Sequence, residues 1–228
     1  MRSSTFTMDQ VHNIFTEELA TRGGRVTDTY KDGNRLFSRS ILPHVKDVRP
    51  RDRLQGGVAI KATQEEICIY PYIFRLVCSN GAIVAETLEA RIISDLNQLE
   101  PYTIVESIHE GIATCSQKKV FTQTVSKMHR SSQKQINQAL DLLAYFTGHS
   151  TLINSEMIKR IMDRFFAETD HSQFGLANAV TSIARDTPNP QTRWNLEALG
   201  GAIAIAAPTS RPKRGAPAVR VTTALAIA

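Results

Sequence analysis

The sequence has few of the residue patterns that identify an enzyme or a metalloprotein. Its three cysteines contain no C-x-x-C pair and its six histidines occur in no H-x-H or H-E-x-x-H group, so the common zinc signatures are absent. The glycines form neither a G-x-S-x-G motif nor a phosphate-binding loop. The sequence therefore predicts no metal, no cofactor and no catalytic residues, and it favours a binding protein over an enzyme.

Long apolar segments are also missing. No run approaches the roughly 18 apolar residues of a transmembrane helix, and the N-terminal segment MRSSTFTMDQ lacks the apolar core of a signal peptide. With 228 residues, of which 42% are hydrophobic and 21% charged, the chain has the composition of an ordinary globular protein. These features predict a cytoplasmic protein without a membrane partner.

The first part of the chain has the pattern of a helix followed by an antiparallel meander. Apolar residues at helical spacing predict a helix at 8–21. Strands are expected at 25–30 and 35–42, because an Asp-Gly pair between them favours a tight turn. The charged segment 44–53 is predicted to be an irregular surface connector, and 58–63 to be the next strand.

The most strand-like segment is 67–84. Its residues are mainly β-branched, aromatic or aliphatic, and an Asn-Gly pair within 79–81 predicts a hairpin turn there. Pro71 cannot donate a hydrogen bond to a neighbouring strand, which predicts either a bulge or an edge strand. Cys68 and Cys78 lie in these apolar strands and are interpreted as buried structural thiols.

Apolar residues at three- and four-residue spacing predict that the second half of the chain is helical. The fold class is therefore α+β: a helix and an antiparallel sheet at 1–85, a helical half packed on it at 86–206, and a disordered basic tail at 207–228. Helices are expected at 88–99, at 104–128, at 133–146 with Ser132 as cap, from Asn154 or Ser155 through Phe165, at 174–184, and from the Asn189-Pro190 pair to 205.

Charged residues occur in blocks. The segment 22–53 holds nine basic and four acidic residues, and 116–140 holds five basic residues and no acid, whereas 86–110 holds six acids and one arginine. Such blocks suit a surface that follows phosphates, or protomers that meet basic face to acidic face. Solvated faces without a partner would give the same pattern.

Nucleic-acid binding through the basic blocks is the first functional hypothesis. Tyr30, Phe37 and Phe121 lie near basic residues in the sequence and could stack on bases, while lysine and arginine follow the backbone. No zinc-finger, RNP or helix-turn-helix signature is present, so base-specific recognition is not expected. The predicted nucleic-acid-binding residues are Arg35, Arg39, Lys46, Arg49, Arg51, Arg53, Arg75, Lys118, Lys119, Lys127, Arg130 and Lys134.

Three short motifs resemble those of a known family. They are RLVCSNG at 75–81, LANAVT at 176–181 and RWNLEALGG at 193–201, and they are similar, in the same order, to motifs of the phage- and plasmid-associated domain of unknown function 932. The resemblance spans roughly 58–205 and implies a protein of a mobile element in a bacterial host cell. The motif residues are Cys78, Asn80, Gly81, Asn178, Thr181, Arg193, Trp194 and Glu197.

The motif residues are interpreted mainly as structural. Asn80 and Gly81 tolerate positive φ and would shape the turn. Asn178 and Thr181 share one helical face, as do Arg193 and Glu197, so these four side chains are expected to form a buried polar network joining their two helices. The alternatives are an active-site role for these residues and a nucleophilic role for Cys78 beside Arg75.

Two hypotheses of different classes follow. The first is a DNA-binding accessory protein that handles single-stranded or recombining DNA without sequence preference, in an annealing-like manner. Its order of helix, meander and long helix is similar to the core of Rad52-like single-strand annealing proteins, at the level of fold alone. The alternative is a structural or host-protein-interaction protein that self-assembles into a homo-oligomer through its helical half.

Overall fold

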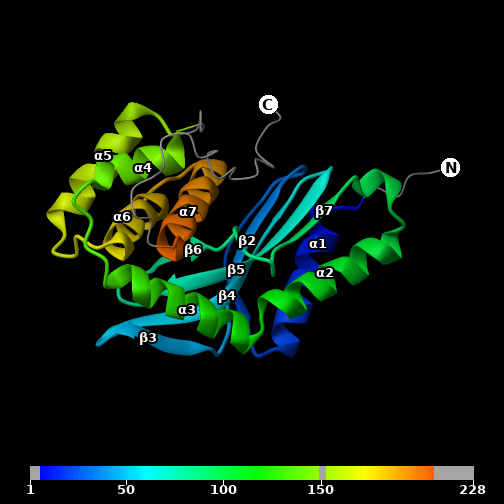
Figure 1. Ribbon diagram of the computed structural model, residues 1–228. Helices are drawn as coiled ribbons and strands as arrows, with labels where there is room; N and C mark the ends of the chain where they lie inside the picture. The colour runs from blue at the N-terminus through cyan, green and yellow to red at the C-terminus, as the bar shows by residue number, and fades with distance from the viewer. Residues whose placement is uncertain (1–5, 149–152, 208–228) are drawn as a thin grey trace.

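Seven strands form one antiparallel sheet at the centre of the protein (Figure 1). The computed structural model describes residues 6–148 and 153–207. Strand order is β1-β2-β4-β5-β6, with β3 paired to β4 and β7 paired to β5. The strands are β1 (Arg25–Lys31), β2 (Leu36–Ile41), β3 (Val45–Arg49), β4 (Asp52–Ala62), β5 (Glu66–Arg75), β6 (Asn80–Ile83) and β7 (Arg91–Ser94).

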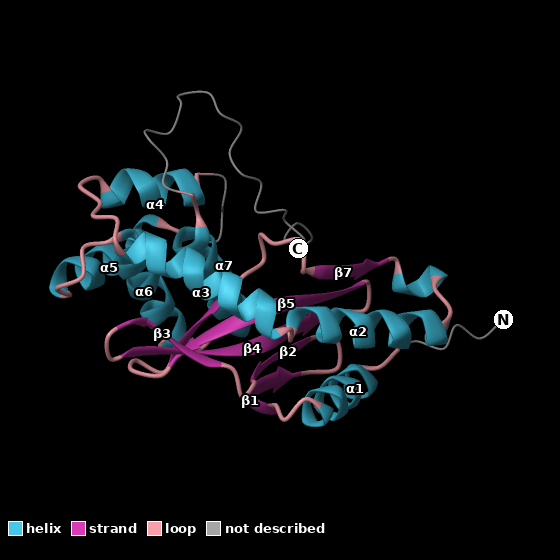
Figure 2. Cartoon of the chain, turned by 60° about the horizontal axis from the view of Figure 1, so that its bottom comes forward, coloured by secondary structure: helices cyan, strands magenta, loops and turns pink. Residues whose placement is uncertain are grey.

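Helices gather at both ends of this sheet, which makes the fold α+β, as predicted. Helices α4 to α7 lie at one end and α1 and α2 at the other, while α2 and α3 follow one another along the sheet (Figure 2). The helices are α1 (Met8–Thr21), η1 (Leu96–Gln98), α2 (Pro101–Cys115), α3 (Lys118–Ser132), α4 (Ala139–Thr147), α5 (Ser155–Ala167), α6 (Gln173–Arg185) and α7 (Pro190–Ile205).

The sheet separates apolar layers because successive side chains of a strand point to opposite faces. On β4, Val58 and Ile60 belong to the layer that α1 and α2 cover. Ala59 lies between them and belongs to the opposite layer, where Tyr72 of β5 packs with Trp194 of α7. A further cluster joins α3, α4, α5, α6 and α7 to the other end of the sheet. Both faces of the central strands β4 and β5 are therefore covered.

Helix α7 lies directly on β6 and α6 because of two adjacent glycines. A methyl group on Gly201 would overlap the Ile83 carbonyl oxygen, and one on Gly200 would overlap the Thr181 methyl group. The glycine pair that ends the third motif is therefore required for close packing.

Several predicted elements are confirmed. Helix α1 has the expected bounds, and Thr7 and Gln10 form a capping box at its start. The hairpins β1–β2 and β5–β6 are antiparallel. Asn154 and Asn189 cap α5 and α7 as expected, each side chain accepting a hydrogen bond from a backbone N–H of the first turn.

Pro71 lies inside a continuous central strand, so both predictions for it were wrong. Its partner is Val58 in an uninterrupted β4–β5 ladder. The Pro71 carbonyl accepts a hydrogen bond from Val84 N at 2.9 Å, on the other side of β5. The position without an N–H faces that same side of β5. Within β5, Ile69 is the last residue paired with β7 and Tyr72 is the first paired with β6, so Pro71 lies in the gap between the two partner strands. No ladder hydrogen bond is lost there.

The β5–β6 turn lies earlier than predicted, at 76–79. Ser79 has a positive φ of 51°, whereas Asn80 and Gly81 are strand residues without positive φ. Gly81 has a different reason to be glycine, because a methyl group there would overlap the Tyr72 hydroxyl. The predicted geometric role of Asn80 and Gly81 in the turn was therefore wrong.

The helix predicted at 88–99 is instead β7 followed by η1. Leu88, which would have begun the apolar stripe, is fully exposed. β5 extends beyond β6 at Glu66–Ile69, and the β-branched residues of β7 pair with that open edge. Tertiary pairing thus outweighs a helical spacing of apolar residues, and the sheet continues past the predicted boundary at residue 85.

Three further boundaries differ from the predictions. The connector at 44–53 contains β3, which forms a hairpin with β4 through Arg51 at a positive φ of 65°. The helix predicted at 104–128 is two helices that separate at 116–117. Gly111 lies inside α2, where its bare backbone fits against Ile69. Ser132 is the last residue of α3, where its hydroxyl donates to the His129 carbonyl. It is therefore not the N-cap of the next helix, α4, which begins at Ala139 after Gln138.

The predicted tail residues Arg211, Lys213 and Arg214 lie outside the described residues. Within 6–148 and 153–207, the helices are all too short or too polar to cross a membrane.

Candidate functional site

The two basic blocks, which are distant in sequence, lie side by side because β3 packs along α3 (Figure 1). Near the start of β3, His44 Nε2 lies 3.1 Å from the Ser116 carbonyl oxygen that precedes α3. Near its end, His129 Nδ1 lies 2.7 Å from the Val48 carbonyl oxygen. Val48 also joins the apolar cluster that contains Phe121. These contacts hold the β3–β4 hairpin against α3 over most of its length.

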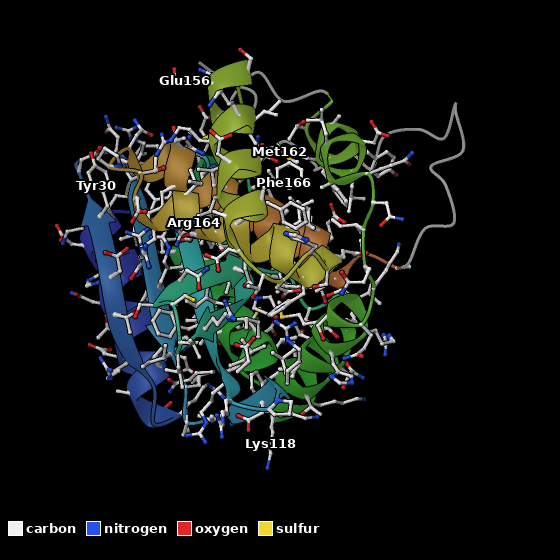
Figure 3. The ribbon with its side chains drawn as sticks, turned by 90° about the vertical axis from the view of Figure 1, so that its left-hand side faces the viewer. Tyr30, Lys118, Glu156, Met162, Arg164 and Phe166 are labelled. Carbon is white, nitrogen blue, oxygen red and sulfur yellow. The ribbon has the colours of Figure 1, made fainter. Side chains whose placement is uncertain are left out.

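A row of cationic side chains runs along α3. Lys119, Lys127 and Arg130 are exposed and spaced to share one face of the helix. Lys118 points away from the rest of the molecule at the start of α3 (Figure 3). Lys46 on β3 lies directly opposite Leu54, which packs in the cluster with α3, so Lys46 shares the face of the hairpin that α3 covers. We call Lys46, Lys118, Lys119, Lys127 and Arg130 the basic surface.

Helix stability does not explain the two lysines at the start of α3, whereas Arg130 in its last turn interacts favourably with the helix dipole. Lys118 and Lys119 occupy the first turn of α3, where the helix dipole is positive, and no side chain caps this end. None of the five cations forms an ion pair with another described residue. The positive potential here is therefore available to a partner.

The other predicted nucleic-acid-binding residues lie elsewhere. Arg35 pairs with Asp32, and Arg53 pairs with Asp47 on the hairpin face opposite Lys46. Arg51 is exposed in the β3–β4 turn, and Lys134 is half-buried beyond the end of α3. Arg39, Arg49 and Arg75 belong to the two clusters described next.

Arg39 is buried, so the prediction that it contacts nucleic acid was wrong. Its side chain is 1% exposed and its Nε lies 2.5 Å from Glu197 Oε2, while Nη1 lies 3.0 Å from Asp28 Oδ2. Arg193 pairs with the same two carboxylates, at 3.2 Å and 3.1 Å. Trp194 covers the Arg39 guanidinium at 5.6 Å. We call this group the closed cluster.

The closed cluster also corrects the predicted network between α6 and α7. Arg193 and Glu197 link α7 to β1 and β2. Asn178 and Thr181 instead contact β6, where Asn80 Nδ2 donates to Thr181 Oγ1 at 2.6 Å and to the Asn178 carbonyl oxygen at 3.4 Å. The four motif residues therefore belong to two separate groups.

The second group borders a pocket of about 610 Å³. It opens between the β3–β4 turn, the β5–β6 turn, the end of α5 and helix α6. Two motifs that are a hundred positions apart in the sequence meet there. The lining residues include Arg49, Asp52, Arg75, Cys78, Asn80, Gln135, Arg164, Glu168, Asp170, Asn178 and Ser182.

Arginine–carboxylate pairs form one wall of this pocket. Arg75 donates to Asp52 through Nε at 2.6 Å and Nη2 at 2.8 Å. Arg49 Nη2 lies 2.7 Å from Asp170 Oδ2 and 3.3 Å from Asp52 Oδ2. Both guanidinium groups lie over the Phe174 ring, at 5.4 Å and 5.7 Å. We call this group the open cluster, because the pocket reaches both arginines.

Cys78 differs from the other two cysteines. Cys68 and Cys115 are buried, and burial raises the pKa of both thiols, that of Cys68 to about 12. Cys78 is half-exposed in the β5–β6 turn, lines the pocket and accepts a hydrogen bond from Arg75 Nη1 at 3.2 Å. The interpretation as a buried structural thiol was therefore correct for Cys68 and wrong for Cys78.

Among the described residues, no three His, Cys, Asp or Glu side chains are placed to hold a metal ion. No family model, curated protein or solved structure matches the chain.

Sequence reasoning did not identify Asp52, Asp170 or Phe174 as parts of a site. Asp52 was placed in a surface connector, yet it is only 6% exposed and is the shared partner of two arginines. An acid between prolines and arginines gives no sequence signal for this pairing. The motif RLVCSNG supplies Arg75, Cys78 and Asn80 to the pocket wall, but it gives no signal for these neighbours.

Proposed function

We propose that this protein binds single-stranded nucleic acid along the basic surface, without sequence preference. The observation that carries the proposal is the alignment of β3 with α3, which joins cations from two distant blocks on one side of the molecule. Five cations that form no ion pair with another described residue suit the phosphates of a nucleic-acid strand. The resemblance to a phage- and plasmid-associated family supplies the setting: an accessory protein of a mobile element.

The aromatic residues limit what such binding can include. Phe37 is fully buried and Phe121 is 6% exposed, so neither ring is able to stack on a base. Tyr30 is partly exposed on the edge strand β1. The proposed interaction is therefore mainly electrostatic, and its affinity should fall steeply with salt.

The salt dependence gives a quantitative test. Each phosphate contact on a single strand contributes about −0.7 to the slope of log K against log salt, so five contacts give a slope of about −3.5. Fluorescence anisotropy with a labelled oligonucleotide, from about 50 mM to about 200 mM salt, measures this slope. Parallel titrations with a duplex and with an RNA strand show which nucleic acid is preferred. Absence of binding at the lowest salt would refute the proposal.

A charge-reversal pair assigns the binding to the basic surface. The variant Lys119→Glu/Lys127→Glu should make the slope of log K against log salt shallower by at least about 1.4, because two phosphate contacts are lost. The matched control is Lys159→Glu/Arg160→Glu, which makes the same change in net charge on exposed positions of α5. Equal effects of both variants would show that net charge alone, and no particular surface, attracts the nucleic acid.

Self-assembly is a second candidate, favoured by one observation. Within the described residues β1 pairs on one side only, with β2, and most of its residues are exposed. An open strand edge can pair with another chain. Light scattering on a sizing column would show a discrete oligomer if copies of this chain associate there, and a Thr27→Pro substitution on β1 should then disrupt it.

A further inference from the structure

The pocket beside the open cluster has no part in the proposed binding of nucleic acid. Its volume of about 610 Å³ is in the range of small-molecule sites. Of the five cations of the basic surface, none lines it. Its wall carries one thiol, that of Cys78, and polar groups from five separate segments of the chain.

The thiol of Cys78 is positioned for reaction with a pocket ligand. Its sulfur is accessible from the pocket and receives a hydrogen bond from Arg75, so a positive charge lies beside the attacking atom. The Cys78 carbonyl oxygen accepts a hydrogen bond from Arg185 Nη1 at 2.7 Å, which anchors the turn to α6. The position of the sulfur is thus fixed from two sides.

A second observation points to a ligand that donates a hydrogen bond. Asn80 lines the same pocket, is 3% exposed, and its Oδ1 has no partner among the described residues. Its orientation is determined by its neighbours: Thr181 Oγ1 donates to the Asn178 carbonyl and must accept from Asn80 Nδ2. The acceptor oxygen therefore remains unused, which is unfavourable for a buried polar group.

The charges of the wall indicate the class of ligand. Three arginines and three carboxylates surround the pocket, namely Arg49, Arg75, Arg164, Asp52, Glu168 and Asp170. A ligand that carries both carboxylate and ammonium groups can pair with both signs, whereas a purely anionic ligand would meet three acids.

We propose that the pocket binds a zwitterionic low-molecular-weight disulfide, of which glutathione disulfide is an example, and that Cys78 exchanges with it. The Cys78 thiolate, having released its proton to water, attacks one sulfur of the ligand. The ligand S–S bond breaks, a new S–S bond to Cys78 forms, and the other half leaves as a thiolate. The product is a reversible mixed disulfide whose ligand half occupies the pocket.

The test compares glutathione disulfide with the uncharged 2-hydroxyethyl disulfide on the full chain. Intact mass and peptide mapping give the rate of modification at each cysteine, in the native protein and in urea. In the native protein we expect modification at Cys78, with Cys68 and Cys115 protected. We also expect the ratio of the glutathione disulfide rate to the neutral disulfide rate to be at least tenfold higher in the native than in the unfolded chain.

Two variants distinguish recognition of the disulfide by the pocket from simple exposure of the Cys78 thiol. Cys78→Ser should abolish the native reaction. Arg164→Gln, on an exposed arm of the pocket where the pair with Glu168 contributes little to stability, should lower the glutathione disulfide rate severalfold and leave the neutral disulfide rate unchanged. Equal rate ratios in native and unfolded chains, or earlier modification of Cys68 or Cys115, would overturn the proposal. Neither result bears on nucleic-acid binding.

Discussion

Two clusters of arginine and carboxylate side chains lie on opposite faces of the β5–β6 hairpin and differ in their access to solvent. In the closed cluster the central Arg39 and Glu197 side chains are 1% and 2% exposed, and only Arg193 and Asp28 at its rim reach 27% and 40%. In the open cluster the Arg49 and Arg75 side chains are 27% and 18% exposed and line a pocket. The same pairing therefore joins secondary structure elements in one place and presents charges to a ligand in the other.

Strand β6 lies between the two sides, and its side chains alternate between them. Asn80 and Ala82 point to α6 and the pocket side, whereas Gly81 and Ile83 point to Tyr72 and the layer under Trp194. One short strand thus faces the pocket on one side and the apolar layer that contains Trp194 on the other. The comparison predicts that substitutions on the closed side affect stability strongly, and that those on the open side affect it weakly.

Breaking the closed cluster should have the largest effect. Arg39→Met removes the partner that Glu197 contacts at 2.5 Å and leaves a buried carboxylate with only Arg193. We expect a loss of roughly 3–5 kcal/mol in the free energy of unfolding, measured by urea denaturation. The double variant Arg39→Met/Glu197→Leu should recover part of this loss, because it removes the uncompensated charge as well. A loss below 1 kcal/mol would mean that water reaches the cluster.

Adding one methyl group to the strand between the clusters should have an intermediate effect. Gly81→Ala would place its methyl group against the Tyr72 hydroxyl, and the ring is held in the layer with Trp194. Overpacking of this kind costs roughly 1–3 kcal/mol. Gly33→Ala is the matched control, because a methyl group there meets no atom within 4 Å. Thermal unfolding of the two variants measures the difference, and equal melting temperatures would contradict the expected overlap.

The sequence predicted α1, the two hairpins and the last three helices because local signals, namely caps, turns and apolar spacing, agree with the final structure there. It failed at 88–99, where an open edge of β5 was available for pairing, and at Pro71, where two partner strands leave a gap. Both features depend on strands that are distant in sequence. The same limit applies to the site: RLVCSNG lines the pocket, but Asp52 and Asp170 acquire their roles only through tertiary contacts.

Removing one charge from the open cluster should have the smallest effect on the free energy of unfolding, and this effect should depend on pH. Burial opposes ionisation of Asp170, but hydrogen bonds from Arg49 and Ser172 outweigh it and hold the pKa of this carboxyl below its usual 3.8. A carboxyl whose pKa is lower in the folded state stabilises the protein above its unfolded pKa, and that contribution disappears as the pH falls through the folded pKa.

The variant Asp170→Asn should therefore be less stable than the parent at about pH 7, by less than about 1 kcal/mol for a partly exposed pair, and the difference should be smaller at about pH 3, where the parent's carboxyl begins to lose this contribution. Urea midpoints at the two pH values measure this. Asp163→Asn is the control, because Asp163 pairs with Lys159 on the exposed side of α5, and little change is expected at either pH. If Asp170→Asn instead destabilised the protein equally at both pH values, the carboxylate would contribute through its shape and hydrogen bonds, and its charge would be fully screened. The open cluster would then differ from the closed one in the effect of its charges as well as in its exposure.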